Sequence, residues 1–323
     1  MGVDVSLLIS AIRAVTLVLA VVCAGAALLG QGGRWSERLD LLNHFEPLWL
    51  TGAIAAGALW IATGREGWIT AALAAAAALA SAGQMAPELL ARRGPERSAP
   101  GASFKLIQFN LWVFNLDPEG AARWILAQDA DVLVLEEASG EQGAVVQQLR
   151  DGYPFATTCV EGRACSTVLL SRRRPMAEAA LQLELRCAAA WASYPAPGGE
   201  VTVVGVHAAW PYPPRLQRRQ SQRLAELLQG LPREKLIVAG DFNSTPWSFA
   251  LRRQDQLFGI ERRTRALFSW PAAAWWPGVR MKPPFPILPI DHVYAGPGWR
   301  AVKVERGPRL GSDHYPLVVT LSA

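Results

Sequence analysis

Three long apolar segments lie near the start of the chain, and shorter apolar runs alternate with amphipathic ones after them. The first segment, about 6–29, is interrupted only by Arg13 and is long enough to cross a hydrocarbon core of about 30 Å. The second, about 45–63, carries a tryptophan near each end, as interfacial anchors do. The third, about 68–85, is mostly alanine and has the weakest pattern. The pattern predicts a membrane anchor of three transmembrane helices, or of two without the alanine-rich segment.

A soluble helical bundle and a cleaved signal peptide are the alternatives for this region. A bundle needs polar faces at helical spacing, which the first segment lacks. A signal peptide has a shorter apolar run, and two further runs follow here. The polar stretch RRGPERSAPG then marks a linker, because it is rich in proline, glycine and charge. We therefore expect an anchor over 1–91, a linker over 92–103 and a second domain over 104–323.

The second domain shows short apolar runs separated by helical segments. The predicted strands are FKLIQFN, ADVLVLEE, STVLLS, VTVVGVH, KLIVAGDFN and PLVVTLS, with helices near Pro118–Gln128 and between the fourth and fifth strands. This alternation predicts an α/β domain. Polar residues end several of the strands: Asn110, Glu137, His207 and Asp241. Because strand ends that share one rim of an α/β domain are where sites are usually built, these residues are candidates for a functional site.

Charge is distributed unevenly between the two regions. Residues 1–97 hold seven basic and seven acidic side chains, so the net charge of +5 lies in the remainder. Basic clusters at 172–174, 215–219 and 262–265 could attract nucleic acid, anionic lipid or a pyrophosphate, and solvated surface is the ordinary explanation for each. The charge pattern thus indicates two environments and leaves the anionic partner open.

Six motifs occur in a fixed order along the second domain: QFNLW, DVLVLEE, GVHAAWP, GDFNSTPWS, IDHVY and GSDHYP. Each is weak alone, and GDFN by itself suits an Asx turn after a strand. Together they resemble the endonuclease/exonuclease/phosphatase superfamily, the DNase I-like fold, over about 104–321. The resemblance implies a four-layer α/β sandwich and a hydrolase that acts on phosphate esters.

Hydrolysis of a phosphate ester requires a cation, a base and donors for the phosphoryl oxygens. Mg²⁺ binds through one or two carboxylates and keeps several waters, so Glu137 and Asp313 are candidate ligands, with Asn110 supplying an amide oxygen. The chain has no Cys/His spacing typical of zinc, which favours Mg²⁺ or Mn²⁺. Glu136 competes with Glu137; strand alternation sends the two to opposite faces, and the family's usual LQE pattern favours Glu137.

The resemblance also implies roles for the remaining polar residues. Asp291 would orient His314 and stabilise its charge, which gives a paired acid/base group. His207 would contact the phosphate or protonate the leaving group. Asp241 would align the attacking water, and Asn243 would hold a phosphoryl oxygen. The histidine that follows Asp291 is predicted to be structural.

The fold does not choose the substrate, because superfamily members act on DNA, RNA, inositol phosphates, sphingomyelin and other lipid phosphates. Tethering to a bilayer raises the local concentration of lipid head groups. A segment rich in proline and tryptophan before Asp291 would supply an apolar lip at the membrane, or would fold back as a lid over the core. The three-helix arrangement is similar to membrane-bound members linked to teicoplanin resistance, which act on an undecaprenyl diphosphate-type substrate.

We therefore expect two kinds of partner, a lipid bilayer and a phosphorylated, lipid-linked substrate. A nuclease acting on DNA or RNA is the alternative enzyme, and a catalytically silent module that binds phospholipid or a partner is the alternative of another class. The sequence predicts no protein partner.

Two signals disagree about which face of the membrane carries the second domain. With the N-terminus outside, five arginines fall on the cytoplasmic side with the second domain and Arg65 falls outside. In contrast, Cys159 and Cys165 flank a short loop and could form a disulfide, with Cys187 as another partner, and disulfides persist in oxidising compartments. The resemblance favours the outer face of the cell (inner) membrane.

Overall fold

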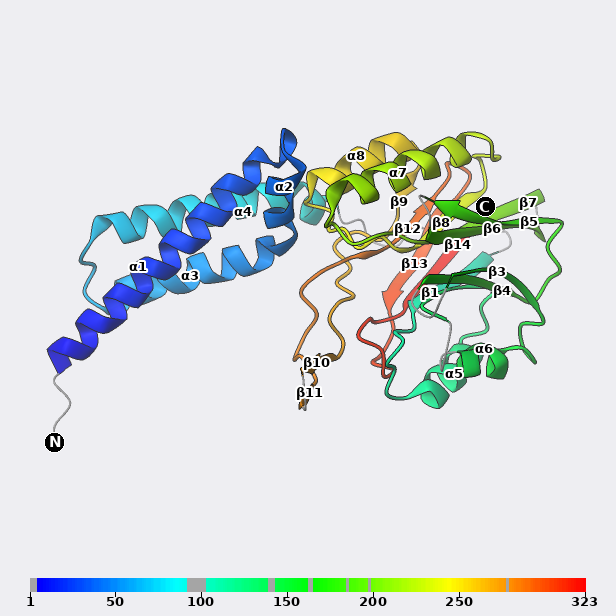
Figure 1. Ribbon diagram of the computed structural model, residues 1–323, viewed down its shortest axis with the longest axis horizontal. Coiled ribbons are helices and arrows are strands. Elements are labelled where there is room, and N and C mark those ends of the chain that lie inside the picture. The colour runs from blue at the N-terminus through cyan, green and yellow to red at the C-terminus, as the bar shows by residue number, and fades with distance from the viewer. Residues whose placement is uncertain are drawn as a thin grey trace. The chain divides into compact units, whose positions relative to one another are not determined.

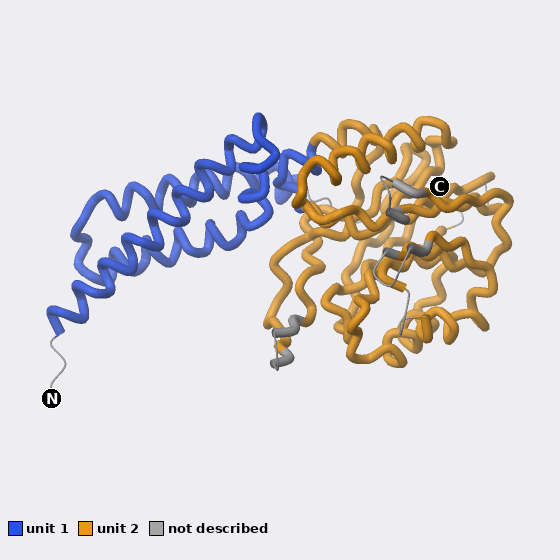
Figure 2. The backbone as a smooth tube through the Cα atoms, in the orientation of Figure 1, with its two compact units in different colours: residues 1–91, 245–252 blue, residues 92–244, 253–323 orange. Residues whose placement is uncertain are grey.

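The computed structural model describes residues 5–91, 103–138, 143–161, 165–183, 186–196, 199–276 and 279–323 (Figure 1). By their contacts the residues form two compact units (Figure 2). We call residues 1–91 with 245–252 the helical unit, and residues 92–244 with 253–323 the α/β unit. The predicted linker lies outside the described residues except at its last position.

Three long helices make up most of the helical unit: α1 (Val5–Gly30), α3 (Glu46–Ala62) and α4 (Trp68–Leu90). Three short elements join α1 to α3: η1 (Gln31–Arg34), α2 (Glu37–Asp40) and η2 (Leu41–Phe45). Within the described residues, three helical stretches are long and apolar enough to cross a membrane. The predicted apolar segments are therefore helices, and the third extends beyond the predicted end at Met85 to Leu90.

Small side chains form the contacts between these helices. The buried positions are mainly alanines, among them Ala20, Ala24, Ala27, Ala53, Ala56 and Ala77. Large apolar side chains such as Leu7, Val15 and Leu79 are exposed instead. This inverse arrangement is expected of helices in lipid, because small residues let backbones approach while lipid covers the larger side chains.

The α/β unit contains two six-stranded mixed sheets. The first has the order β13-β14-β1-β2-β4-β3, formed by Arg300–Arg306, Leu317–Ser322, Ser103–Asn110, Val132–Glu136, Cys165–Ser171 and Phe155–Glu161. The second has the order β5-β6-β7-β8-β12-β9, formed by Ala177–Leu183, Arg186–Ala196, Gly199–His207, Leu236–Asp241, Asp291–Ala295 and Glu261–Arg262. A two-stranded sheet joins β10 (Ala274–Trp276) to β11 (Val279–Met281).

The two large sheets face each other, and helices cover their outer sides (Figure 1). Buried residues of both sheets form one core, for example Leu106, Val134, Val203 and Ile237. Helices α5 (Pro118–Ala127) and α6 (Gly143–Leu149) pack a second core against the first sheet. Helices α7 (Pro214–Gln229) and α8 (Phe249–Phe258) lie beyond the second sheet. The predicted four-layer α/β sandwich is confirmed.

Strand register brings the predicted polar strand ends together. Parallel strands β7 and β8 pair His207 with Asp241, and antiparallel β12 pairs Asp291 with Asp241. In the first sheet, β1 is parallel to β2, so Asn110 lies opposite Glu136. Gly240 allows the close approach of β8 to β7, because a Cβ atom there would lie 1.8 Å from the carbonyl oxygen of Val206.

Candidate active site

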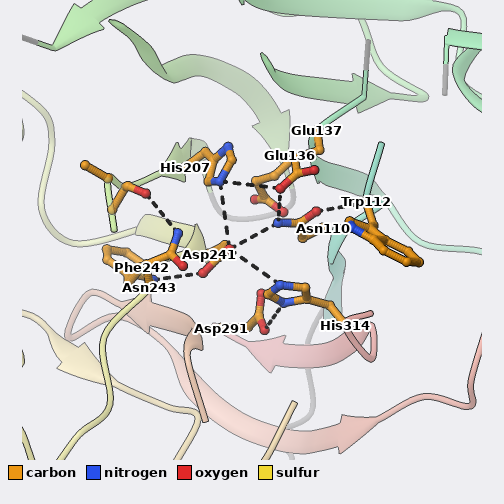
Figure 3. A network of polar contacts seen from close by, with 12 residues as sticks. Asn110, Trp112, Glu136, Glu137, His207, Asp241, Phe242, Asn243, Asp291 and His314 are labelled. Carbon is orange, nitrogen blue, oxygen red and sulfur yellow. Dashed lines mark hydrogen bonds and ion pairs between the residues drawn. The ribbon is translucent and has the colours of Figure 1, made fainter. Parts of the chain in front are cut away.

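Asn110 and Glu137 bring the end of the first sheet into the site (Figure 3). The Asn110 Nδ2 atom donates to Glu137 Oε1 at 3.2 Å and to Asp241 Oδ2 at 3.1 Å. The Val113 backbone N–H donates to Glu137 Oε2 at 3.1 Å. Glu137 has a φ of 52°, in the left-handed region that non-glycine residues seldom adopt. The chain therefore turns sharply at this residue, which places its carboxylate beside Asn110.

Asp241 lies at the centre of the network. Its Oδ2 atom is 3.9 Å from His207 Nε2 and 3.7 Å from His314 Nε2. Its Oδ1 atom accepts the backbone N–H of Asn243 at 2.8 Å, and the Asn243 side chain donates to the Ala208 carbonyl at 3.0 Å. His207 Nε2 is also 4.0 Å from Glu137 Oε1. One carboxylate thus connects groups from both sheets.

His314 and Asp291 form a buried pair at the edge of this network. The His314 Nδ1 atom is 2.8 Å from Asp291 Oδ2, and both side chains are almost fully buried. Ser312 fixes the loop that carries His314, since its hydroxyl accepts the His314 backbone N–H and donates to the carbonyl of Asn110. Ser312 therefore ties the backbone of His314 to the end of β1, and the Asp291 carboxylate holds the His314 ring.

Burial and charge shift the ionisation of these groups strongly. Burial raises the pKa of Asp241 to about 7, and the Asp291 charge adds to this against the opposing effect of His314. For His314, burial alone would lower the pKa, but Asp291, Asp313 and Asp241 together hold it well above 6.5. Burial would raise the pKa of Asp291, but the charge of His314 and hydrogen bonds from His314, Ser269 and Gln108 together outweigh burial and lower that pKa. The site therefore holds an imidazolium between carboxylates.

Gln108, which the sequence does not predict as a site residue, and Glu136, the alternative to Glu137, also contact the site. The Gln108 side-chain nitrogen donates to Glu136 Oε2 at 2.9 Å and to Asp291 Oδ1 at 2.8 Å. Burial, followed by Asp291 and Asp241, raises the pKa of Glu136 well above its usual range. A signal was available, because Gln108 and Asn110 are two apart in a strand and so share a face. Gln108, which is also bonded to Glu136, therefore helps to orient the Asp291 carboxylate.

Asp313 has a different set of partners. The Trp270 ring N–H donates to Asp313 Oδ2 at 3.1 Å, and burial raises the pKa of this carboxyl. Its Oδ1 atom is buried without a hydrogen-bond partner. The histidine after Asp291, His292, bonds the Ser244 carbonyl at 2.9 Å, away from the network. The structure thus joins seven of the eight predicted residues by direct contacts: Asn110, Glu137, His207, Asp241, Asn243, Asp291 and His314.

These side chains suit a hard divalent cation. Asp241, Asp291 and His314 each carry a ligand-type atom, and the three atoms lie within 4.8 Å of one another, but His314 could be a ligand only as a neutral imidazole. This cluster differs from the predicted ligands Asn110, Glu137 and Asp313. The Asn110 nitrogen faces Glu137 and Asp241 while its oxygen accepts the Trp112 N–H at 2.9 Å, so an oxygen ligand beside those carboxylates would need a rotated amide. The excess of buried carboxylate over cationic side chains nevertheless favours a bound cation, because uncompensated buried charge is costly.

Without metal, the protein is expected to lose stability as pH rises. The folded-state pKa of Asp241, about 7, lies above its ordinary 3.8, so the folded protein binds the proton more tightly and the free energy of unfolding falls as pH rises through this window. The raised pKa of His314 extends the loss to higher pH. In a chelator, Tm should fall between about pH 5 and about pH 8, and Mg²⁺ at the higher pH should restore it. A chelated protein whose Tm rises over that range would contradict this assignment.

Residues 107–314 match the Endonuclease/Exonuclease/phosphatase family. No curated protein matches the chain in sequence. Among solved structures, TDP2 from D. rerio with a single-strand DNA product is 15% identical with a TM-score of 0.55, and sphingomyelinase C from Streptomyces griseocarneus is 19% identical with a TM-score of 0.50. A double mutant of beta toxin from Staphylococcus aureus with bound magnesium ions is 12% identical with a TM-score of 0.50. Each alignment covers 69% of this chain and 100% of the other. The family match spans more than half of the chain, which therefore belongs to the endonuclease/exonuclease/phosphatase family, with a DNase I-like fold in its α/β unit.

Proposed function

We propose that this protein is a membrane-anchored, divalent-metal-dependent hydrolase that cleaves a phosphate ester or diphosphate in a lipid-linked substrate. The observation that carries the proposal is the network around Asp241, which gathers carboxylates, imidazoles and amides from the ends of both sheets. Members of this family hydrolyse phosphate esters, and one similar structure is described with bound magnesium ions. A magnesium ion would neutralise charge on the phosphoryl oxygens.

The residues supply the remaining chemistry in this proposal. Asp241 aligns the attacking water, and its pKa near neutrality suits it to accept that water's proton. The new phosphorus–oxygen bond replaces the bond to the leaving group. His207, beside Glu137, protonates the leaving oxygen. His314, kept charged by Asp291, stabilises the negative phosphoryl group together with Asn243.

Exposed aromatic side chains favour a lipid-linked substrate. Four of them lie on loops next to site strands, and we call them the aromatic rim: Phe114, Trp210, Tyr212 and Phe285. They are 64–74% exposed. Exposed aromatic side chains in loops that adjoin site strands suit an apolar ligand or interface, and Trp and Tyr suit a lipid–water boundary. The side chains of Trp275 and Trp276, which belong to the predicted lip, lie outside the described residues.

The test is turnover by the purified full chain on matched substrates. With Mg²⁺, we expect faster hydrolysis of a lipid diphosphate or lipid phosphodiester than of single-stranded or plasmid DNA, and none in a chelator. Preference for DNA would support the nuclease alternative, since one similar structure carries a DNA product. No hydrolysis of any substrate would support the silent binding module.

Removing the rim should weaken activity only on substrates in a bilayer. The double variant Trp210→Ser, Tyr212→Ser loses apolar area that lipid would cover, so the apparent KM for a substrate in vesicles should rise about tenfold or more. Turnover of a short, soluble phosphate ester should not change. Leu126→Ser is the matched control, because Leu126 is also an exposed apolar side chain but lies on α5. Equal losses on both substrates would contradict a lipid role for the rim.

We also infer that the α/β unit faces the outside of the cell (inner) membrane. Cys159 is bonded in a disulfide, and Cys23 is free. The side chains of both candidate partners, Cys165 and Cys187, lie outside the described residues. An outer location predicts that reduction increases the labelling of intact cells by an impermeant thiol reagent, because reduction releases two further thiols. Absence of labelling after reduction would instead support the cytoplasmic placement.

A further inference from the structure

The segment that follows the GDFN motif belongs to the helical unit. We call residues 245–252, TPWSFALR, the docking segment; by their contacts they group with residues 1–91 (Figure 2). Trp247 is fully buried there, and Thr245 and Ser248 are buried with it. A polar turn after a catalytic strand is thus packed among the ends of apolar helices.

Asp40 caps the helix that begins in this segment. Its Oδ1 atom accepts the Phe249 backbone N–H at 2.8 Å, and its Oδ2 atom accepts the Ala250 backbone N–H at 2.7 Å. These N–H groups begin α8, where a helix has no internal acceptors for them. A carboxylate at this position also interacts favourably with the helix dipole. Asn43 donates to Asp40 Oδ1 at 2.8 Å, which fixes the orientation of the carboxylate.

Further hydrogen bonds hold the first half of the docking segment. His44 Nδ1 is 3.3 Å from the Thr245 backbone nitrogen and 3.2 Å from its hydroxyl oxygen. The Gln84 side chain donates to the carbonyl of Trp247 at 2.8 Å, and the Trp247 ring N–H donates to the carbonyl of His44 at 3.4 Å. Both backbone and side-chain groups of the segment are therefore held by η2 and α4.

Ser244 alone separates the docking segment from Asn243 of the candidate active site. His292 holds the carbonyl of Ser244, and Asp241 holds the N–H of Asn243. Asn243 has a φ of 49°, in the left-handed region that asparagine adopts more readily than most non-glycine residues. Since Thr245 follows Ser244 directly, displacement of the docking segment would pull on the turn that carries Asn243 and Asp241.

We propose that Asp40 and His44 are positioning residues, through which the helical unit fixes Asp241 and Asn243 for catalysis. The helical unit then has a second role besides attachment, because the fold of the helices determines the geometry of the site. Displacement of a catalytic group by about 1 Å can cost about 100-fold in rate, so a loosened segment should be visible in turnover. The expected loss of turnover rests on the proposed function, but the contacts of the docking segment can be measured by hydrogen exchange without it.

The experiment compares Asp40→Asn with Glu66→Gln in the full chain in lipid nanodiscs. Both variants remove one carboxylate from the helical unit, but Glu66 pairs with Arg13 and not with the docking segment. On a soluble phosphate ester, Asp40→Asn should lower kcat about 10- to 100-fold with little change in KM. It should also speed hydrogen exchange of a peptide covering 245–252. Glu66→Gln should match the wild type in kcat and in this exchange.

Thr245→Val is the milder second variant, because it removes only the hydroxyl that contacts His44. It should also speed hydrogen exchange of residues 245–252 and lower kcat, but by less than Asp40→Asn does. Wild-type kcat in a variant with faster exchange would overturn the proposal, and so would unchanged exchange in Asp40→Asn. If the wild type hydrolyses nothing, the proposed function fails. The affinity for Mn²⁺ then replaces kcat as the measurement. We expect Asp40→Asn to bind Mn²⁺ more weakly than the wild type, and equal affinities would contradict the inference.

Discussion

Replacing Asp241 by asparagine is expected to lower kcat for phosphate ester hydrolysis by about 1,000-fold or more. Asparagine has nearly the same shape and still offers an oxygen to the Asn243 N–H, so the turn should keep its geometry. The variant loses the negative charge and the proton acceptor at the centre of the network. Steady-state kinetics with Mg²⁺ on a soluble phosphate ester measures this loss.

The same variant should be more stable than the wild type when metal is removed. Burial raises the pKa of Asp241 to about 7, so ionising this side chain above that pH opposes folding. Asparagine carries no charge, and Tm in a chelator should rise at alkaline pH while the Tm increase caused by Mg²⁺ shrinks. Lost activity together with gained stability separates a functional group from a structural one.

Asp255→Asn is the matched control for this experiment. Asp255 is a carboxylate of the same unit that accepts the Tyr294 hydroxyl and pairs with Arg262, outside the network. Its replacement should lower stability and leave kcat close to the wild-type value. Wild-type turnover by Asp241→Asn would remove the proposed mechanism, since Asp241 contacts both His207 and His314.

The strand ends were predictable because local pattern and register act together. Asn110, His207 and Asp241 each end an apolar run, and parallel pairing of their strands places such ends at one edge. The long apolar helices were predictable for a similar reason, since length and hydropathy are properties of continuous segments. Information carried within a single element was therefore sufficient for most of the architecture.

Contacts between distant elements were not predictable from the sequence. Gln108 reaches Asp291 in the opposite sheet, and the packing of two sheets leaves no periodic signal in either strand. Asp40 and Phe249 are 209 positions apart, so this helix cap has no local signature in the sequence. Glu137 shows the limit of a local rule, because its left-handed backbone interrupts the alternation of side chains that a continuing strand would have.

Replacing Asp291 by asparagine should lower kcat about 100- to 10,000-fold and should move one limb of the pH–rate profile to lower pH. Asp291 is the principal negative charge that raises the pKa of His314 against the effect of burial. Asparagine can still accept a hydrogen bond from Nδ1, but it does not stabilise the imidazolium. The pKa of His314 should therefore fall.

The direction of this shift does not depend on the role of His314. If the charged form is required, the alkaline limb moves to lower pH; if the neutral form is required, the acidic limb does. The profile of kcat/KM between about pH 5 and about pH 10 measures the shift, because it reports groups of the free enzyme. His314→Gln should abolish the same limb, whereas Asp255→Asn should leave it in place. A limb that stays fixed in Asp291→Asn would show that the buried pair does not control the titration that limits turnover, and a limb that moves to higher pH would contradict the electrostatic assignment of the site.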